Sequence, residues 1–130
     1  MDFAVIDSGG TSRLRLGQRR DDVRATNGTY REFRRTPSSQ PADHFLETGP
    51  MVSYDANGLA VAIEFAEPAQ VTLEGVALIG ASLDHLRDAL QQVGIAMIDA
   101  DEGAQIETLR MELYAPSGTV EGVMLGEDSS

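Results

Sequence analysis

The chain has 130 residues, 42% of them hydrophobic, and a formal net charge of −11 at pH 7. This length and composition favour a single folded domain, residues 1–130, with a core of its own, and exclude a wholly disordered chain. The sequence contains no Cys, which excludes disulfides, thiolate nucleophiles and zinc–thiolate sites.

The N-terminal segment predicts a short strand and then a turn. Residues 1–6 suit a strand, and residues 7–13 (DSGGTSR) combine a Gly pair with hydroxyls and an Arg. Backbone N–H groups in such a segment can hold a phosphate, but the Lys and the spacing of a P-loop are missing, so a flexible turn is favoured. The chain starts without a basic segment and apolar stretch, and no run reaches the roughly 18 apolar residues of a membrane span. We therefore expect a cytoplasmic protein with no membrane contact.

The next segments predict a helix, a strand and a loop. Residues 18–28 (QRRDDVRATNG) suit a short helix that ends at the Gly, and residues 29–35 (TYREFRR) suit a strand. Residues 36–43 (TPSSQPAD) contain two Pro and two Ser, which deny hydrogen bonds to both helix and sheet, so a surface loop is expected.

Three strand candidates follow this loop. They are residues 44–55 (HFLETGPMVSYD), 58–66 (GLAVAIEFA) and 70–78 (QVTLEGVAL). The second alternates large apolar residues with small or charged ones, which is typical of a strand with one buried face. Its predicted buried residues are Leu59, Val61, Ile63 and Phe65.

The second half predicts a helix and then more strands. In residues 81–94 (ASLDHLRDALQQVG), Ser82 suits the N-cap, Leu residues recur at helical spacing, and Gly94 ends the helix. Residues 95–99 and 107–115 suit strands on either side of an acidic turn, residues 100–105 (ADEGAQ). Residues 119–125 suit a last strand, and residues 127–130 suit a frayed tail.

The two halves are similar in sequence. Gly17 aligns with Gly80 at an offset of 63, and farther along Tyr54 and Gly58 align with Tyr114 and Gly118 at an offset of 60. The pattern predicts an α+β fold of two repeated units, each a short helix packed on an antiparallel β-meander, sharing one core. The units span about residues 12–75 and 76–126. Around residues 121–122 the match is imperfect, so the second hairpin is expected to pair differently or to contain a bulge.

The repeated segments resemble a known module. Residues 17–28 (GQRRDDVRATNG) are similar to the opening helix of the small modules in the β-lactamase-inhibitor-protein family and the outer-membrane assembly lipoproteins. YDANGLAVAI resembles the hairpin that follows in those modules, and YAPSGTVEGV repeats it. In that inhibitor family, two modules in tandem present a concave sheet surface to a protein target. The resemblance therefore implies a protein-binding function.

Candidate catalytic and metal-binding groups are few. His44 beside Asp43 can form an oriented base, as a small hydrolase needs, but no G-x-S-x-G motif is present, so a solvated loop pair is favoured. Asp99, Asp101 and Glu102 carry oxygen ligands that suit calcium or magnesium, but the closing Glu of an EF-hand is missing. An acidic hairpin turn is favoured there, and we expect no metal site, no cofactor and no catalytic residue.

Charge is unevenly distributed along the chain. All ten basic residues are Arg; residues 1–35 hold eight of them and five of the 21 acids, a net charge of +3, and the remainder carries −14. Such a field repels nucleic acid and attracts a basic partner. A surface that is acidic only for solubility is the favoured explanation of this charge. We expect the N-terminal Arg side chains to pair with acids of the second half.

These observations lead to a functional hypothesis. The chain is expected to be a non-enzymatic, bacterial immunity or inhibitor-type protein that neutralises a basic protein partner. Because YAPSG keeps the Tyr and Gly of YDANG but not its acid, Tyr54 and Gly58 are interpreted as structural and Asp55 as a contact. The alternatives are a regulatory or scaffold domain that acts through self-association, and a small hydrolase using His44 and Asp43. The chain is expected to be a monomer or a homodimer. The predicted partner contacts are Asp55, Asp99, Asp101, Glu102, His44 and Tyr30.

Overall fold

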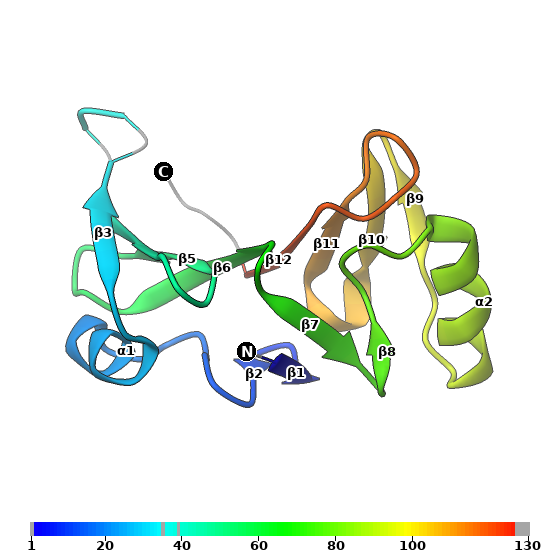
Figure 1. The fold of residues 1–130 in the computed structure, drawn as a ribbon, viewed down its shortest axis with the longest axis horizontal. Coiled ribbons are helices and arrows are strands. Elements are labelled where there is room, and N and C mark those ends of the chain that lie inside the picture. The colour runs from blue at the N-terminus through cyan, green and yellow to red at the C-terminus, as the bar shows by residue number, and fades with distance from the viewer. Residues whose placement is uncertain (1, 35, 39, 127–130) are drawn as a thin grey trace.

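The structure is a computed structural model that describes residues 2–34, 36–38 and 40–126. These residues form two α-helices and two β-sheets, so the expected α+β class is confirmed (Figure 1). The predicted tail at residues 127–130 lies outside the described residues.

The larger sheet has eight antiparallel strands and spans both halves of the chain. Its first four strands come from the first half and its last four from the second half, with β6 and β12 side by side at the centre. In spatial order the strands are β3 (Tyr30–Phe33), β4 (Ala42–Phe45), β5 (Met51–Tyr54), β6 (Ala60–Ala66), β12 (Gly122–Gly126), β11 (Met111–Tyr114), β10 (Gly103–Ile106) and β9 (Ile98–Ala100).

The smaller sheet also joins the two halves. Its order is β2 (Gly10–Thr11), β1 (Asp2–Asp7), β7 (Gln70–Leu73) and β8 (Val76–Ala77), and β1 pairs with β7 in parallel. The sequence interpretation did not anticipate this second sheet. It treated residues 70–78 as one strand, whereas Glu74 and Gly75 form a turn between β7 and β8.

The core lies between the large sheet and a layer formed by the helices and the small sheet (Figure 1). Helix α1 (Arg20–Asn27) contributes Val23, and α2 (Leu83–Gln92) contributes Leu86 and Leu90. Phe3 of β1 packs on Phe65 of β6, with ring centroids 5.0 Å apart. These side chains belong to one continuous cluster, so the described residues share one core.

Helix α2 matches the sequence pattern closely. Ser82 is its N-cap, and the side-chain oxygen accepts the N–H of His85 at 3.1 Å. The helix ends at Gln92, and Gly94 has a φ of +81°, a backbone conformation that favours Gly. The predicted helix boundaries are therefore confirmed to within two residues.

The strand boundaries differ more from the prediction. The loop expected over residues 36–43 ends at Pro41, because Ala42 and Asp43 belong to β4; Ser39 lies outside the described residues. The single strand expected over residues 44–55 is the end of β4, a turn, and β5. In the acidic segment at residues 100–105, only Asp101 and Glu102 form the turn between β9 and β10.

In each half, a junction of two backbone hydrogen bonds joins the start of the helix to the hairpin that follows. The Gly17 N–H donates to the carbonyl of Ala60 at 2.7 Å, and the Gly80 N–H donates to the carbonyl of Val120 at 2.8 Å. The first helical residue then donates its N–H to the carbonyl of the Gly in the hairpin turn. This bond runs from Arg20 to Gly58 at 2.8 Å in one half, and from Leu83 to Gly118 at 2.9 Å in the other.

The two hairpin tyrosines lie on opposite faces of the large sheet. Tyr54 is buried on the core side, whereas Tyr114 is 50% exposed on the outer side. The β5–β6 register shifts by one residue just before Tyr54, which pairs with Ala60, whereas Tyr114 pairs with Gly122 in an unshifted ladder. The burial of Tyr54 agrees with its interpretation as structural, whereas the aligned Tyr114 does not have the same role in its hairpin.

A pair of substitutions tests the matching junctions. Gly17 and Gly80 have φ values of +87° and +91°, and no atom lies within 4 Å of an added Cβ at either position. Only the backbone conformation opposes a side chain, so Gly17→Ala and Gly80→Ala should each lower the free energy of unfolding by about 1–2 kcal/mol. Urea titrations of both variants measure this. A cost at one position that is several-fold larger than at the other would contradict the equivalence.

Candidate functional site

A row of cross-strand neighbours runs over the outer face of the large sheet. Met51 pairs with Glu64, Glu64 with Met124, Met124 with Glu112, and Glu112 with Gln105. Paired residues point to the same face, and strand residues alternate between faces. Since their neighbours Val52, Ile63, Leu125, Met111 and Ile106 face the core, this row faces away from it.

The outer face is hollowed along this row. The hollow has a volume of about 920 Å³, and its lining extends from Met51 to the turn between β9 and β10. Gly122 and Ala66 lie side by side next to Tyr114, so two small residues leave space where larger side chains would fill it. Figure 1 shows that the large sheet changes direction between the strands of its first half and β10 and β11.

The lining of the hollow is acidic and partly apolar. No Arg, Lys or His occurs among the described residues that line it. Met51, Met124 and Tyr114 add apolar surface between the acids. A concave surface concentrates the field of its charges, so the hollow attracts cations. Its five carboxylate residues are Glu64, Asp101, Glu102, Glu112 and Glu121.

Two of these acids were predicted from the sequence, and the other three were not. Asp101 and Glu102 were predicted contacts, and both lie at the hollow. Glu64 belongs to β6 and lies far along the chain from Glu112 of β11 and from Glu121, which immediately precedes β12. The alternation of MELY, in which Glu112 and Tyr114 share a face, was a signal that could have placed two lining residues together.

His44 and Tyr30 lie outside the hollow. His44 pairs with Met51 and so lies on the outer face, one strand beyond the lining. Tyr30 is 39% exposed on β3, and its ring packs on Phe45 and under the Arg24 guanidinium, 4.3 Å from the ring centroid.

Two predicted acidic contacts already have partners within the chain. The Oδ1 atom of Asp55 accepts the N–H groups of Asn57 at 2.8 Å and Leu59 at 3.0 Å, so its carboxylate holds the turn of its own hairpin. Asp99 pairs with the guanidinium of Arg87. Among the described residues, no group of three or more His, Asp or Glu is arranged to hold a metal ion.

Asp43 and His44 do not form the oriented pair that a hydrolase would use. They are consecutive residues of β4, so their side chains point to opposite faces. Asp43 is 0% exposed on the core side and accepts three hydrogen bonds: from Arg24 Nε at 2.7 Å, from Arg24 Nη2 at 2.9 Å and from the Tyr54 hydroxyl at 2.9 Å. The expectation of a solvated loop pair is also wrong, because Asp43 is buried.

The buried Asp43 organises a polar cluster under the first half of the sheet. Its hydrogen bonds raise the pKa of the Arg24 guanidinium, and Glu32 adds a weaker ion pair with Arg24 at 3.6 Å. Burial, and then the Asp43 charge, raise the pKa of the Tyr54 hydroxyl. The Arg20 guanidinium lies over the Tyr54 ring, 5.0 Å from its centroid.

The second half keeps only part of this chemistry, because Arg24 aligns with Arg87, whereas two other polar positions of α1 are apolar in α2. At the offset of 63 found in the sequence, Arg20 and Asn27 of α1 align with Leu83 and Leu90 of α2. Leu90 is fully buried, and Asn27 is buried with its amide bonded to the Val23 carbonyl at 2.8 Å. The two helices therefore stabilise their halves by different chemistry.

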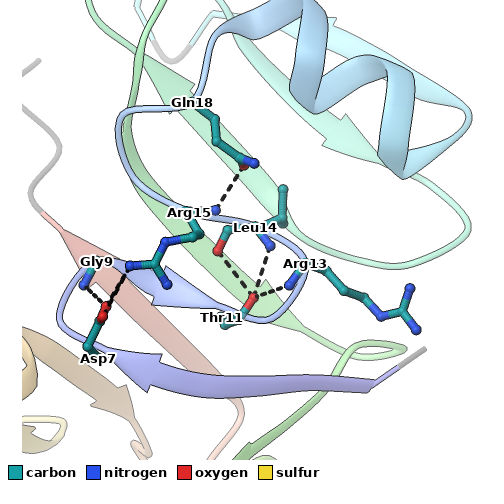
Figure 2. Close-up of polar contacts among 7 residues, drawn as sticks. All are labelled: Asp7, Gly9, Thr11, Arg13, Leu14, Arg15 and Gln18. Atoms are coloured by element: carbon teal, nitrogen blue, oxygen red, sulfur yellow. Dashed lines mark hydrogen bonds and ion pairs between the residues drawn. The ribbon is translucent and has the colours of Figure 1, made fainter.

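The N-terminal turn satisfies its own donors, as Figure 2 shows. Thr11 Oγ1 accepts the N–H groups of Leu14 at 3.1 Å and Arg13 at 3.3 Å. Asp7 accepts the Gly9 N–H at 2.8 Å and the Arg15 guanidinium at 2.9 Å, and these contacts, the Gly9 bond first, lower the pKa of Asp7. These backbone donors are occupied, so the structure does not favour a phosphate site here.

The N-terminal Arg residues do not pair as expected in the cases of Arg15 and Arg24. Their acidic partners, Asp7 and Asp43, lie in the same half of the chain. These two Arg residues therefore do not neutralise acids of the second half.

Neither of the two helices in the described residues is long and apolar enough to cross a membrane.

Comparison of the chain with protein-family models, with curated proteins and with solved structures found no match. The resemblance to the inhibitor modules therefore stays a prediction.

Removal of the buried carboxylate tests the polar cluster. Asp43→Asn leaves the guanidinium of Arg24, which is largely buried with 23% of its side chain exposed, with only the weaker ion pair to Glu32. We expect the free energy of unfolding to fall by about 3–5 kcal/mol in urea titrations. The control Asp99→Asn breaks the exposed ion pair with Arg87 and should cost less than about 1 kcal/mol. Similar losses in the two variants would contradict the assignment.

The raised pKa of Tyr54 predicts a loss of stability at high pH. Folding favours the protonated phenol, so this contribution is complete below the pKa of an unfolded Tyr, about 10, and is lost as the pH rises above it. The loss is at most about 1.4 kcal/mol per pH unit. Urea titrations at several pH values from neutral to above 10 should show a steeper decline for the wild type than for Tyr54→Phe. Parallel declines would refute the assignment, because the other two Tyr are common to both proteins.

Proposed function

We propose that the chain is a non-enzymatic protein-binding module that holds a basic protein partner in the acidic hollow of the large sheet. The observation that carries this proposal is the set of five carboxylate residues around one concave surface with no basic residue in its described lining. A second hollow, of about 580 Å³ beside β8 and α2, has no carboxylate among the described residues that line it.

The composition of the hollow suits a protein partner. Interfaces between proteins depend on a few anchoring residues, among which Tyr is enriched, and Met is common at surfaces that adapt to a partner. Met51, Met124 and Tyr114 provide such groups beside the acids. The carboxylates then supply orientation and a fast association rate, and the apolar groups supply buried area.

A neutralising role is consistent with this chemistry. An immunity or inhibitor-type protein acts by occupying its target, so it needs surface complementarity and no reacting group. The net charge of −11 would draw in a basic target, such as a toxin domain, at a rate that falls as salt is added. We propose this bacterial, cytoplasmic role for the chain, and the resemblance to tandem inhibitor modules supports it by analogy of architecture.

We also propose that the two halves are copies of one unit. The matched junctions at Gly17 and Gly80 support this. So does the central register, in which Ala62 pairs with Gly126 and Ala66 with Gly122, symmetrically about the Glu64–Met124 pair. Unequal costs of Gly17→Ala and Gly80→Ala would count against it.

Self-association is a second candidate, because β9 lies at an edge of the large sheet. All three of its residues are exposed, and Ile98 is 47% exposed, so the strand can pair with another chain. Light scattering at high protein concentration distinguishes the candidates. A tight dimer favours self-association, and a monomer excludes it.

Capture of a partner from a lysate of the source cell tests the main proposal. Glu112→Gln/Glu121→Gln removes two charges from the hollow, and Asp88→Asn/Glu107→Gln removes two from exposed positions outside its lining. A basic protein should bind to the wild type and to the second variant, bind far less to the first, and elute when salt is added. An acidic partner, or a partner held equally by both variants and at all salt concentrations, would contradict the proposal.

A further inference from the structure

The three tyrosines of the chain differ in one respect. Tyr30 has the Arg24 guanidinium over its ring at 4.3 Å, and Tyr54 has the Arg20 guanidinium over its ring at 5.0 Å. Tyr114 has no Arg of the described residues over its ring, and half of its surface is exposed in the acidic hollow. Two of the three Tyr rings are thus covered by an Arg guanidinium of the same chain, and the third ring is left open.

The surroundings of Tyr114 provide the other parts of an Arg site. In the internal example, Arg24 lies over Tyr30 while its Nε and Nη2 atoms bind the carboxylate of Asp43. Glu112 lies two residues before Tyr114 on the same face of β11, and Glu121 donates its backbone N–H to the Tyr114 carbonyl at 2.8 Å. A ring and carboxylates therefore occur together again, this time without a cation from the described chain.

Space for an incoming side chain exists beside the ring. Gly122 is the cross-strand partner of Tyr114, and a Cβ added there would lie 3.8 Å from the Tyr114 Cβ. Ala66 is the next residue across the sheet. An Arg stem can rest on these small residues, with the guanidinium over the ring.

We propose that the hollow recognises an Arg side chain of the basic partner, with its guanidinium stacked on Tyr114 and paired with Glu112 and Glu121. This inference rests on the proposed function and specifies the group that is bound. A guanidinium is planar, weakly hydrated and able to bind a carboxylate through two N–H groups while stacking on a ring. A Lys ammonium is a compact, strongly hydrated charge and gains less from the same site.

Two peptides of equal length and charge test the inference on the full chain. One alternates Gly with Arg, and the other alternates Gly with Lys. Isothermal titration at low salt should show the Arg peptide binding about tenfold more tightly. Tyr114→Phe keeps the ring and should keep the preference, whereas Tyr114→Ala should bind both peptides equally. Gly122→Val fills the space beside the ring and should weaken the binding of both.

The outcomes separate this inference from the proposed function. One outcome is that the wild type binds both peptides with equal affinity and that Glu112→Gln/Glu121→Gln binds neither. This result would overturn the Arg inference and leave the acidic hollow as a general cation site. A preference for Arg that survives in Tyr114→Ala would overturn the assignment to this ring. Failure of both peptides to bind, or binding that is unchanged in Glu112→Gln/Glu121→Gln, would overturn both proposals. Unchanged urea midpoints of the variants would show that each loss is local.

Discussion

The pairing of β6 with β12 is the interaction on which the rest of the structure depends. It joins the two meanders into one sheet, with Glu64 opposite Met124 at its centre. In this register Ile63 and Leu125 enter the core, and Glu64 and Met124 face the hollow. A slip of one residue would exchange the two faces. One register therefore defines both the core of the protein and its acidic surface.

The two halves use this shared frame differently. The first half buries an ion pair between Asp43 and Arg24 and turns Tyr54 inward to bond with it. A buried pair of this kind contributes little net stability but is costly to break, so it fixes one arrangement of α1 on the sheet. The second half has an apolar core instead, and Tyr114 is free to face outward. The asymmetry between the halves thus places the open aromatic ring among the acids.

Local patterns in the sequence predicted the parts of the fold that local forces decide. Leu spacing and Ser82 located α2, and the alternation at Ile63 and Phe65 located the buried face of the second part of β6. The same prediction is wrong at Leu59 and Val61, which are only half-buried, while Ala60 and Ala62 are buried where the register with β5 shifts. The burial of Asp43 was missed because the six residues before it contain two Pro and two Ser, which is typical of a loop. Its partners lie elsewhere, on α1 and β5. The hollow was missed for a related reason: Glu64 and Glu112 become neighbours of Met124 only through long-range strand pairing. Periodicity identifies the face of a strand but not its neighbours.

The most direct test of the account is the methyl NMR spectrum of the Met residues during titration with the Arg peptide. Met51 and Met124 line the hollow, whereas Met111 is buried in the core and Met97 is absent from the lining. If a basic ligand occupies the hollow, the methyl signals of Met51 and Met124 should shift and saturate together while those of Met97 and Met111 stay in place. Binding that shifts Met97 alone, or that leaves both Met51 and Met124 unchanged, would contradict it.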